Sequence, residues 1–155
     1  MSAQPEVRTL NLPDADATEQ LGVQFAALVE PGDVLLLDGP IGAGKTHFAR
    51  SLIRAFLGRM EDVPSPTFTL VQTYGEAPEI WHADLYRLTH PDEVIELGLD
   101  EAFETAICLI EWPERLGSLQ PEKALTLRFS LTDGGAARQV AFHGDAEWAK
   151  RLEGL

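Results

Sequence analysis

The sequence predicts a single α/β domain over residues 1–155, a three-layer sandwich with a mixed, mainly parallel central sheet. The chain is 45% hydrophobic and 24% charged, which suffices to bury one core. Two short aliphatic runs, Val34 to Leu37 and Ile107 to Ile110, are typical of strands buried on both faces of a parallel sheet. Apolar residues at helical spacing occur between and around these runs, so strands and helices are expected to alternate.

Residues 7–12 alternate weakly and predict a short strand that ends at Pro13 and Asp14, where a helix can begin. A helix is expected next, and the spacing of Asp16 and Glu19 matches a capping box near its start. Large apolar residues then recur on one helical face until Pro31, namely Leu21, Phe25 and Leu28.

The first aliphatic run is followed by a glycine-rich turn and an amphipathic helix over 45–57, which stops at Gly58. Two strands, 69–74 and 80–84, are expected to form a hairpin. The remaining expected elements are an acidic helix after Pro91, the strand 107–110, a short helix around 114–116, a closing antiparallel pair over 124–131 and 139–142, and a helical tail over 145–152.

The formal net charge is −13 at pH 7, from 12 lysine and arginine against 25 aspartate and glutamate residues. Because phosphate recognition needs a basic surface, we expect any nucleic acid to be met through a partner. The one cysteine, Cys108, excludes an internal disulfide and a zinc site made of several thiolates. Apolar runs are too short to cross a membrane, so we expect a cytoplasmic protein with no membrane role.

The glycine-rich turn is the clearest chemical signal. Residues 39–46 read Gly-Pro-Ile-Gly-Ala-Gly-Lys-Thr and match the phosphate-binding pattern G-x-x-x-x-G-K-[ST] in full. This stretch leaves a buried strand and opens a helix, so that its backbone N–H groups converge at a positive helix end. We therefore expect a P-loop NTPase-like domain that binds a nucleoside triphosphate, with Lys45 at the β- and γ-phosphates and Thr46 on Mg²⁺.

Such a site also needs an acid that holds the metal, usually at the end of a neighbouring apolar strand. Glu111 follows the more apolar run and is assigned to Mg²⁺. Asp84 follows a less apolar run and is assigned either to the same metal or to polarising the attacking water, as a catalytic residue beside Lys45.

Four further features have both a structural and a functional interpretation. Residues 65–68, Ser-Pro-Thr-Phe, follow the helix at the position of many nucleotide switches, but a plain loop is the favoured interpretation. His82 is interpreted as a packed strand residue rather than a ligand. Arg87 either neutralises charge at the γ-phosphate or pairs with an acid, and Trp112 either packs in the core or contacts the site.

Two patterns that the sequence lacks bear on which base is bound and which reaction is catalysed. No N-K-x-D sequence, which reads guanine in GTPases, occurs in the chain, so adenine is favoured. The sequence also lacks an obvious arginine-rich lid of the kind that shields the transferred group from water in small-molecule kinases. Hydrolysis is thus favoured over phosphoryl transfer.

Four blocks, in this order and spacing, resemble the bacterial TsaE (YjeE) family: residues 39–46, 65–68, 82–88 (His-Ala-Asp-Leu-Tyr-Arg-Leu) and 109–113 (Leu-Ile-Glu-Trp-Pro). The resemblance covers most of the chain. It implies a small P-loop ATPase with weak turnover that is required for threonylcarbamoyladenosine in transfer RNA. It also implies a complex with the TsaB and TsaD proteins, so that transfer RNA is met only indirectly.

The resemblance further implies a role for individual residues. The ATP phosphates are expected at Gly42, Ala43, Gly44, Lys45, Thr46 and His47. Mg²⁺ is expected at Thr46 and Glu111, and Asp84 is expected near the γ-phosphate. The segment 14–18, with Ala15 and Thr18, is expected against the adenine, and Arg138 is a late nucleotide contact. His47 stands where many members have threonine, but a backbone N–H contact with phosphate does not depend on that side chain.

Two other functions remain open from the sequence. A small-molecule phosphotransferase would show ADP release that depends on an acceptor. A nucleotide-gated binding module with incidental hydrolysis would show partner affinity that changes between ATP, ADP and no nucleotide. The acidic surface and the basic residues of 50–59 are both candidate docking surfaces.

Overall fold

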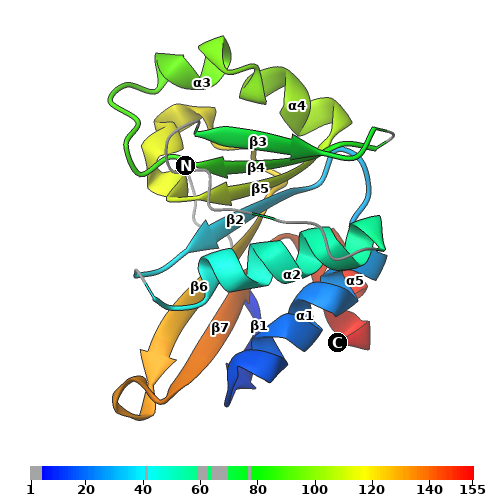
Figure 1. Ribbon diagram of the computed structural model, residues 1–155, viewed down its shortest axis with the longest axis vertical. Helices are drawn as coiled ribbons and strands as arrows, with labels where there is room; N and C mark the ends of the chain where they lie inside the picture. The colour runs from blue at the N-terminus through cyan, green and yellow to red at the C-terminus, as the bar shows by residue number, and fades with distance from the viewer. Residues whose placement is uncertain (1–4, 41, 59–62, 64–69, 77) are drawn as a thin grey trace.

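The computed structural model describes residues 5–40, 42–58, 63, 70–76 and 78–155. Seven strands form one sheet in the order β1-β7-β6-β2-β5-β4-β3 (Figure 1). They are β1 (Glu6–Leu12), β2 (Val34–Asp38), β3 (Val71–Tyr74), β4 (Ile80–Asp84), β5 (Ile107–Glu111), β6 (Leu125–Thr132) and β7 (Ala137–His143). The segment 65–68, for which a loop was the favoured interpretation, lies outside the described residues.

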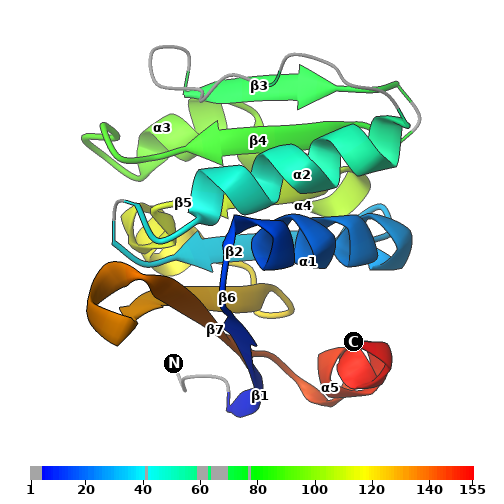
Figure 2. The ribbon, with the colours of Figure 1, turned by 60° about the horizontal axis from the view of Figure 1, so that its bottom comes forward.

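The sheet is mixed, as predicted. The central neighbours β6, β2, β5 and β4 are parallel, while β1, β7 and β3 join at the two edges by antiparallel pairing. Figure 2 shows the strands one above another, from β3 at the top to β1 at the bottom. The predicted hairpin of β3 with β4 and the closing pair of β6 with β7 are both confirmed.

Helices cover both faces of the sheet. They are α1 (Ala15–Leu28), α2 (Lys45–Leu57), α3 (Asp92–Glu96), α4 (Leu99–Thr105) and α5 (Ala146–Arg151), with short 3-10 turns η1 (Pro113–Leu119), η2 (Asp133–Gly135) and η3 (Leu152–Gly154). The capping box predicted at Asp16 and Glu19 is wrong. Helix α1 begins after Asp14, where its start was expected, because the side chain of Asp14 caps it by accepting from the Ala17 N–H at 2.9 Å.

Strand β2 shows why the chain folds into three layers. Leu35 and Leu37 face the core under α1 and α2, while Val34 and Leu36 face the core under α3, α4 and η1. All four are at most 3% exposed, and burial of each such side chain contributes about 1.5–3 kcal/mol. Figure 2 shows α1 and α2 together on one face of the sheet. Within the described ranges, no helix is long and apolar enough to cross a membrane.

The parallel strands bring three loops to one edge of the sheet. In the strand register Leu37 and Asp84 both lie opposite Glu111, so β2, β5 and β4 end at the same level. Ligands of open α/β sheets bind at this carboxyl edge.

Candidate functional site

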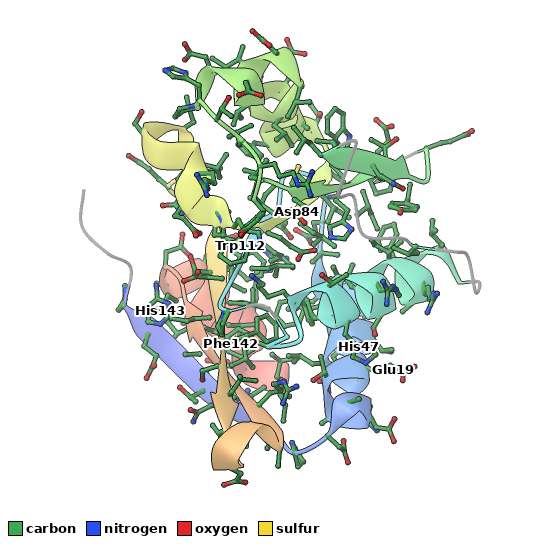
Figure 3. The ribbon with its side chains drawn as sticks, turned by 60° about the vertical axis from the view of Figure 1, so that its left-hand side comes forward. Glu19, His47, Asp84, Trp112, Phe142 and His143 are labelled. Atoms are coloured by element: carbon green, nitrogen blue, oxygen red, sulfur yellow. The ribbon has the colours of Figure 1, made fainter. Side chains whose placement is uncertain are left out.

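A pocket of about 660 Å³ lies at the carboxyl ends of the central strands, within the size range of small-molecule sites. It is lined by ten of the residues predicted from sequence: Ala15, Thr18, Gly42, Gly44, Lys45, Thr46, His47, Asp84, Glu111 and Arg138. Ala43 is the exception, since its side chain is fully buried and its N–H donates to the Pro40 carbonyl at 3.2 Å. Asp84, Trp112 and His47, labelled in Figure 3, come from three separate segments and all line this pocket.

The loop between β2 and α2 needs glycine at its first position. Gly39 has a φ of +137°, and a Cβ there would lie 2.4 Å from the carbonyl oxygen of Phe129 on β6. Gly44, with a φ of +105°, forms the N-cap of α2. Both positions exclude ordinary side chains, so the loop stays tight against the sheet.

The first turn of α2 has the features of an anion-binding site. Its Gly44 cap offers no side-chain hydrogen bond, and the first turn contains no acidic residue. The leading N–H groups of a helix have no partner within the helix, and they lie at the positive end of its dipole. The N–H groups of Lys45, Thr46 and His47 can therefore donate hydrogen bonds to phosphate oxygens.

Lys45 is held inside the site rather than in solvent. Its side chain is 5% exposed, its Nζ donates to the Gly39 carbonyl at 2.5 Å, and the same atom lies 3.7 Å from the centroid of the Trp112 ring. Burial lowers the pKa of Lys45, although Glu111 and other nearby carboxylates oppose the shift. A desolvated ammonium interacts more strongly with an anionic ligand than a solvated one does.

Trp112 contacts the site as well as the core, so both of its interpretations hold. Its backbone is in the left-handed region, with a φ of 58°. Its ring lies under the Lys45 ammonium and 4.9 Å from the Tyr86 ring, measured between centroids, and it also packs against the core cluster on the α3 and α4 side. The contact with Lys45 places the indole beside the start of α2.

Thr46 and Glu111 meet although 65 residues separate them. The Thr46 hydroxyl donates to Oε1 of Glu111 at 2.9 Å, and Oε2 of Glu111 accepts from Nε2 of His82 at 2.7 Å. Two adjacent ligands of an octahedral Mg²⁺ lie about 3 Å apart, so the Thr46 and Glu111 oxygens fit that ion. The described residues hold no cluster of three or more histidine, cysteine or acidic side chains that could bind a metal alone. Magnesium usually keeps several waters and shares phosphate oxygens, so one hydroxyl and one carboxylate can serve as its protein ligands.

Asp84 lines the same pocket from the end of β4. Its Oδ1 accepts from the Tyr86 N–H at 3.0 Å, which fixes the carboxylate direction. Burial, as the largest cause, raises the pKa of Asp84, and the neighbouring Glu111 acts in the same direction. A raised pKa makes this carboxylate a better proton acceptor than an ordinary aspartate. Arg87 also lines the pocket.

The far end of the pocket is made by segments distant in sequence. His47 donates from Nε2 to the Ala15 carbonyl at 3.1 Å, which joins the starts of α2 and α1. Arg138 donates from Nε to the Gly42 carbonyl at 3.0 Å and from Nη1 to the Gly135 carbonyl at 2.9 Å. These contacts tie the connection between β6 and β7 to the phosphate-binding loop.

Sequence reasoning missed some of the lining residues. Leu12 and Tyr86 line the pocket, and each follows or ends a strand at its carboxyl edge, a position that could have indicated them. His82 was correctly interpreted as packed in a strand, since it is fully buried, but its bond to Glu111 was not predicted.

The chain is similar to known proteins in sequence and in fold. The sequence model of threonylcarbamoyl adenosine biosynthesis protein TsaE matches residues 12–140. A protein of Rickettsia bellii named tRNA threonylcarbamoyladenosine biosynthesis protein TsaE is 42% identical over 76% of this chain and 83% of its own length. The protein of that name in Haemophilus influenzae is 36% identical over 95% and 96%. The crystal structure of YdiB from Bacillus subtilis superposes with a TM-score of 0.78 at 27% identity, covering 98% of this chain and 94% of that one.

Proposed function

The chain belongs to the TsaE family, and from this premise we propose that it is a Mg²⁺-dependent ATP-binding and ATP-hydrolysing protein of the cytoplasm that serves threonylcarbamoyladenosine modification of transfer RNA. Its relatives carry the name of that modification. The observation that carries the proposal is the convergence of Lys45, Thr46 and Glu111 in one pocket at the start of α2.

The phosphates of ATP are proposed to bind over residues 42–47, against the N–H groups of the first turn of α2. Among the described residues, Nζ of Lys45 contacts the neutral Gly39 carbonyl and the Trp112 ring. A phosphate oxygen is a stronger partner for an ammonium than either of these, so binding of ATP should draw Lys45 to the phosphates. The adenine is proposed to lie between the α1 start, at Ala15 and Thr18, and Arg138.

Thr46 and Glu111 are proposed to hold the magnesium ion through their oxygens. When bound, the ion supplies positive charge that stabilises the phosphoryl oxygens during transfer. Lys45 would add a second positive charge.

Asp84 is proposed to polarise the attacking water rather than to bind the metal. Its raised pKa supports this role, because the carboxylate can then accept a proton more readily as water attacks the γ-phosphorus. The products are ADP and phosphate. We propose that the protein works in a complex with the TsaB and TsaD proteins, and that it approaches transfer RNA only through that complex.

Replacement of Lys45 tests the proposal. In a strain whose only copy is Lys45→Ala, we expect the modified nucleoside to disappear and ATP turnover of the purified variant to fall by roughly 100-fold or more. Lys150→Ala, which changes an exposed lysine of α5, is the matched control and should leave both unchanged. Undiminished modified nucleoside in the Lys45→Ala strain would contradict the proposal.

A further inference from the structure

We propose that His82 is a positioning residue that holds Glu111 in the orientation needed to bind the magnesium–nucleotide complex. This inference rests on the proposed function and adds a residue to its site. The hydrogen bond from Nε2 of His82 to Oε2 of Glu111, 2.7 Å long, is its starting point.

The register of two parallel strands places this pair. Asp84 on β4 lies opposite Glu111 on β5, and His82 lies opposite Leu109. Because side chains alternate along a strand, His82 and Asp84 share one face of β4. The same alternation puts Glu111 on the face that α2 covers, since Ile107 and Leu109 belong to the core cluster there. Ile80 belongs to the same core cluster, so His82 lies on this face as well and contacts Glu111 from the neighbouring strand.

Each oxygen of Glu111 has a different partner. Oε1 accepts from Thr46, whose hydroxyl is itself an expected metal ligand, and Oε2 accepts from His82. If the Thr46 hydroxyl turns to the metal, its bond to Glu111 weakens. The bond from His82 does not depend on the metal, so it can hold the carboxylate before and after binding.

Among the described residues, the bond to Glu111 is the hydrogen bond that the buried His82 side chain makes. The side chain is fully buried and Glu111 is 3% exposed. A carboxylate oxygen only accepts hydrogen bonds, so Nε2 of His82 donates. Nδ1 is buried and has no hydrogen-bond partner within the part of the chain that the structure describes. An apolar residue would fill this space without an unpaired polar atom, so packing alone does not explain a histidine here.

Partners of metal ligands typically change metal affinity by about 10–100-fold when they are removed. We expect His82→Leu, which keeps the bulk but removes the donor, to raise the Mg²⁺ concentration needed for tight binding of a non-hydrolysable ATP analogue by about that factor. Calorimetric titration with the analogue over a series of Mg²⁺ concentrations measures this. Binding in EDTA should not change, because the contacts of the phosphate-binding loop remain.

Two further variants separate positioning from packing. His82→Gln places an amide N–H close to the position of Nε2 and should restore most of the Mg²⁺ dependence of the wild type. His90→Leu changes an exposed histidine, with 67% of its side chain accessible, and should behave as the wild type. Thermal unfolding of each variant reports its stability separately.

An unchanged Mg²⁺ requirement in His82→Leu would overturn the inference while leaving the proposed function intact. An equal loss in His82→Leu and His82→Gln would overturn it too, because the donor would then not matter. Absence of any Mg²⁺-dependent analogue binding by the wild type would overturn the proposed function and the inference together.

The wild-type protein provides a test that does not depend on the folding of a variant. In ¹⁵N-histidine NMR spectra we expect a slowly exchanging Nε2–H signal from His82 that persists when the ATP analogue binds and shifts when Mg²⁺ is then added. A signal that does not respond to Mg²⁺, or the absence of that proton, would overturn the inference.

Discussion

The two ends of the pocket are built differently. The phosphate end, which is proposed to bind the phosphates, is lined by Lys45, Thr46, Asp84 and Glu111, with His82 buried behind Glu111, and it lies on the central parallel strands and the start of α2. Lys45, His82 and Glu111 there are at most 5% exposed. The base end, made by Ala15, Thr18 and the segment 135–138, joins the start of α1 to the antiparallel edge of the sheet.

The contacts differ in the same way. At the phosphate end charged side chains contact other functional side chains, as Glu111 does with Thr46 and His82. At the base end the hydrogen bonds of Arg138 to described residues go to main-chain carbonyls, and Gly135 beside it is exposed. Preorganised, buried charges contribute more to transition-state stabilisation than exposed ones. We therefore expect substitutions at the phosphate end to affect chemistry and metal binding, and those at the base end to affect affinity modestly.

The largest effect is expected for Asp84→Asn. Turnover of bound ATP should fall by roughly 100-fold or more, since the amide cannot accept a proton from water. The affinity for ATP with Mg²⁺ should stay close to the wild-type value, because Thr46 and Glu111 remain. Single-turnover kinetics and calorimetry measure the two quantities, with Asp100→Asn, an exposed position on α4, as the control. Parallel losses of affinity and turnover would instead assign Asp84 to the metal.

Glu111→Ala tests the metal position at the same end. The Mg²⁺ concentration that gives half-maximal turnover should rise by at least about 10-fold, because the ion loses its only buried carboxylate partner among the predicted ligands. Glu114→Ala removes an exposed acid three residues further along and should leave the titration unchanged. A wild-type magnesium titration for the Glu111 variant would remove that residue from this role.

Substitution of two glycines with positive φ tests how tightly the backbone is packed at the two ends of the pocket. Gly39→Ala puts a Cβ 2.4 Å from the Phe129 carbonyl oxygen, whereas Gly134→Ala, beside the base end, meets nothing within 4 Å. Both carry the cost of a left-handed alanine, but only the first also forces a clash. We expect Gly39→Ala to lower the free energy of unfolding by about 1–3 kcal/mol more than Gly134→Ala. Urea denaturation measures this, and equal losses would show that the loop can shift away from β6.

The smallest effect is expected for Arg138→Ala. Its bonds to the Gly42 and Gly135 carbonyls are exposed, so their loss should weaken ATP affinity by about 2–10-fold. Turnover of bound ATP should remain as in the wild type, because the bonds of Arg138 are to main-chain carbonyls and not to the proposed catalytic or metal-binding side chains. Arg115→Ala, an exposed arginine of η1, is the control. A greater loss in turnover than in affinity would place Arg138 in the chemistry.

Local patterns predicted most of the elements. The aliphatic runs of β2 and β5 identified buried parallel strands, because residues covered on both faces of a sheet need no polar alternation. The match at 39–46 identified the loop that precedes α2, since its glycines, lysine and threonine follow directly from the geometry of a phosphate-binding turn. The acids at the ends of β4 and β5 followed from the same logic.

Contacts between segments that are distant in the chain could not be predicted from the sequence. The bond from Arg138 to Gly42 spans 96 residues, and that from His82 to Glu111 depends on which strands pair and in what register. The start of α1 near Asp14 was expected, but the capping box at Asp16 and Glu19 was wrong, because only the backbone and hydrogen-bond geometry shows that Asp14 is the cap. Hydrophobic periodicity does not indicate which residue caps a helix or which distant side chains form hydrogen bonds.

Calorimetry of the wild-type protein with ATP, with and without Mg²⁺, tests the nucleotide site most directly. We expect one ATP per chain, with binding that tightens when Mg²⁺ is present and that is lost in Lys45→Ala. Absence of binding heat with Mg²⁺ and ATP, under conditions in which the protein is folded, would contradict the assignment of this pocket to ATP.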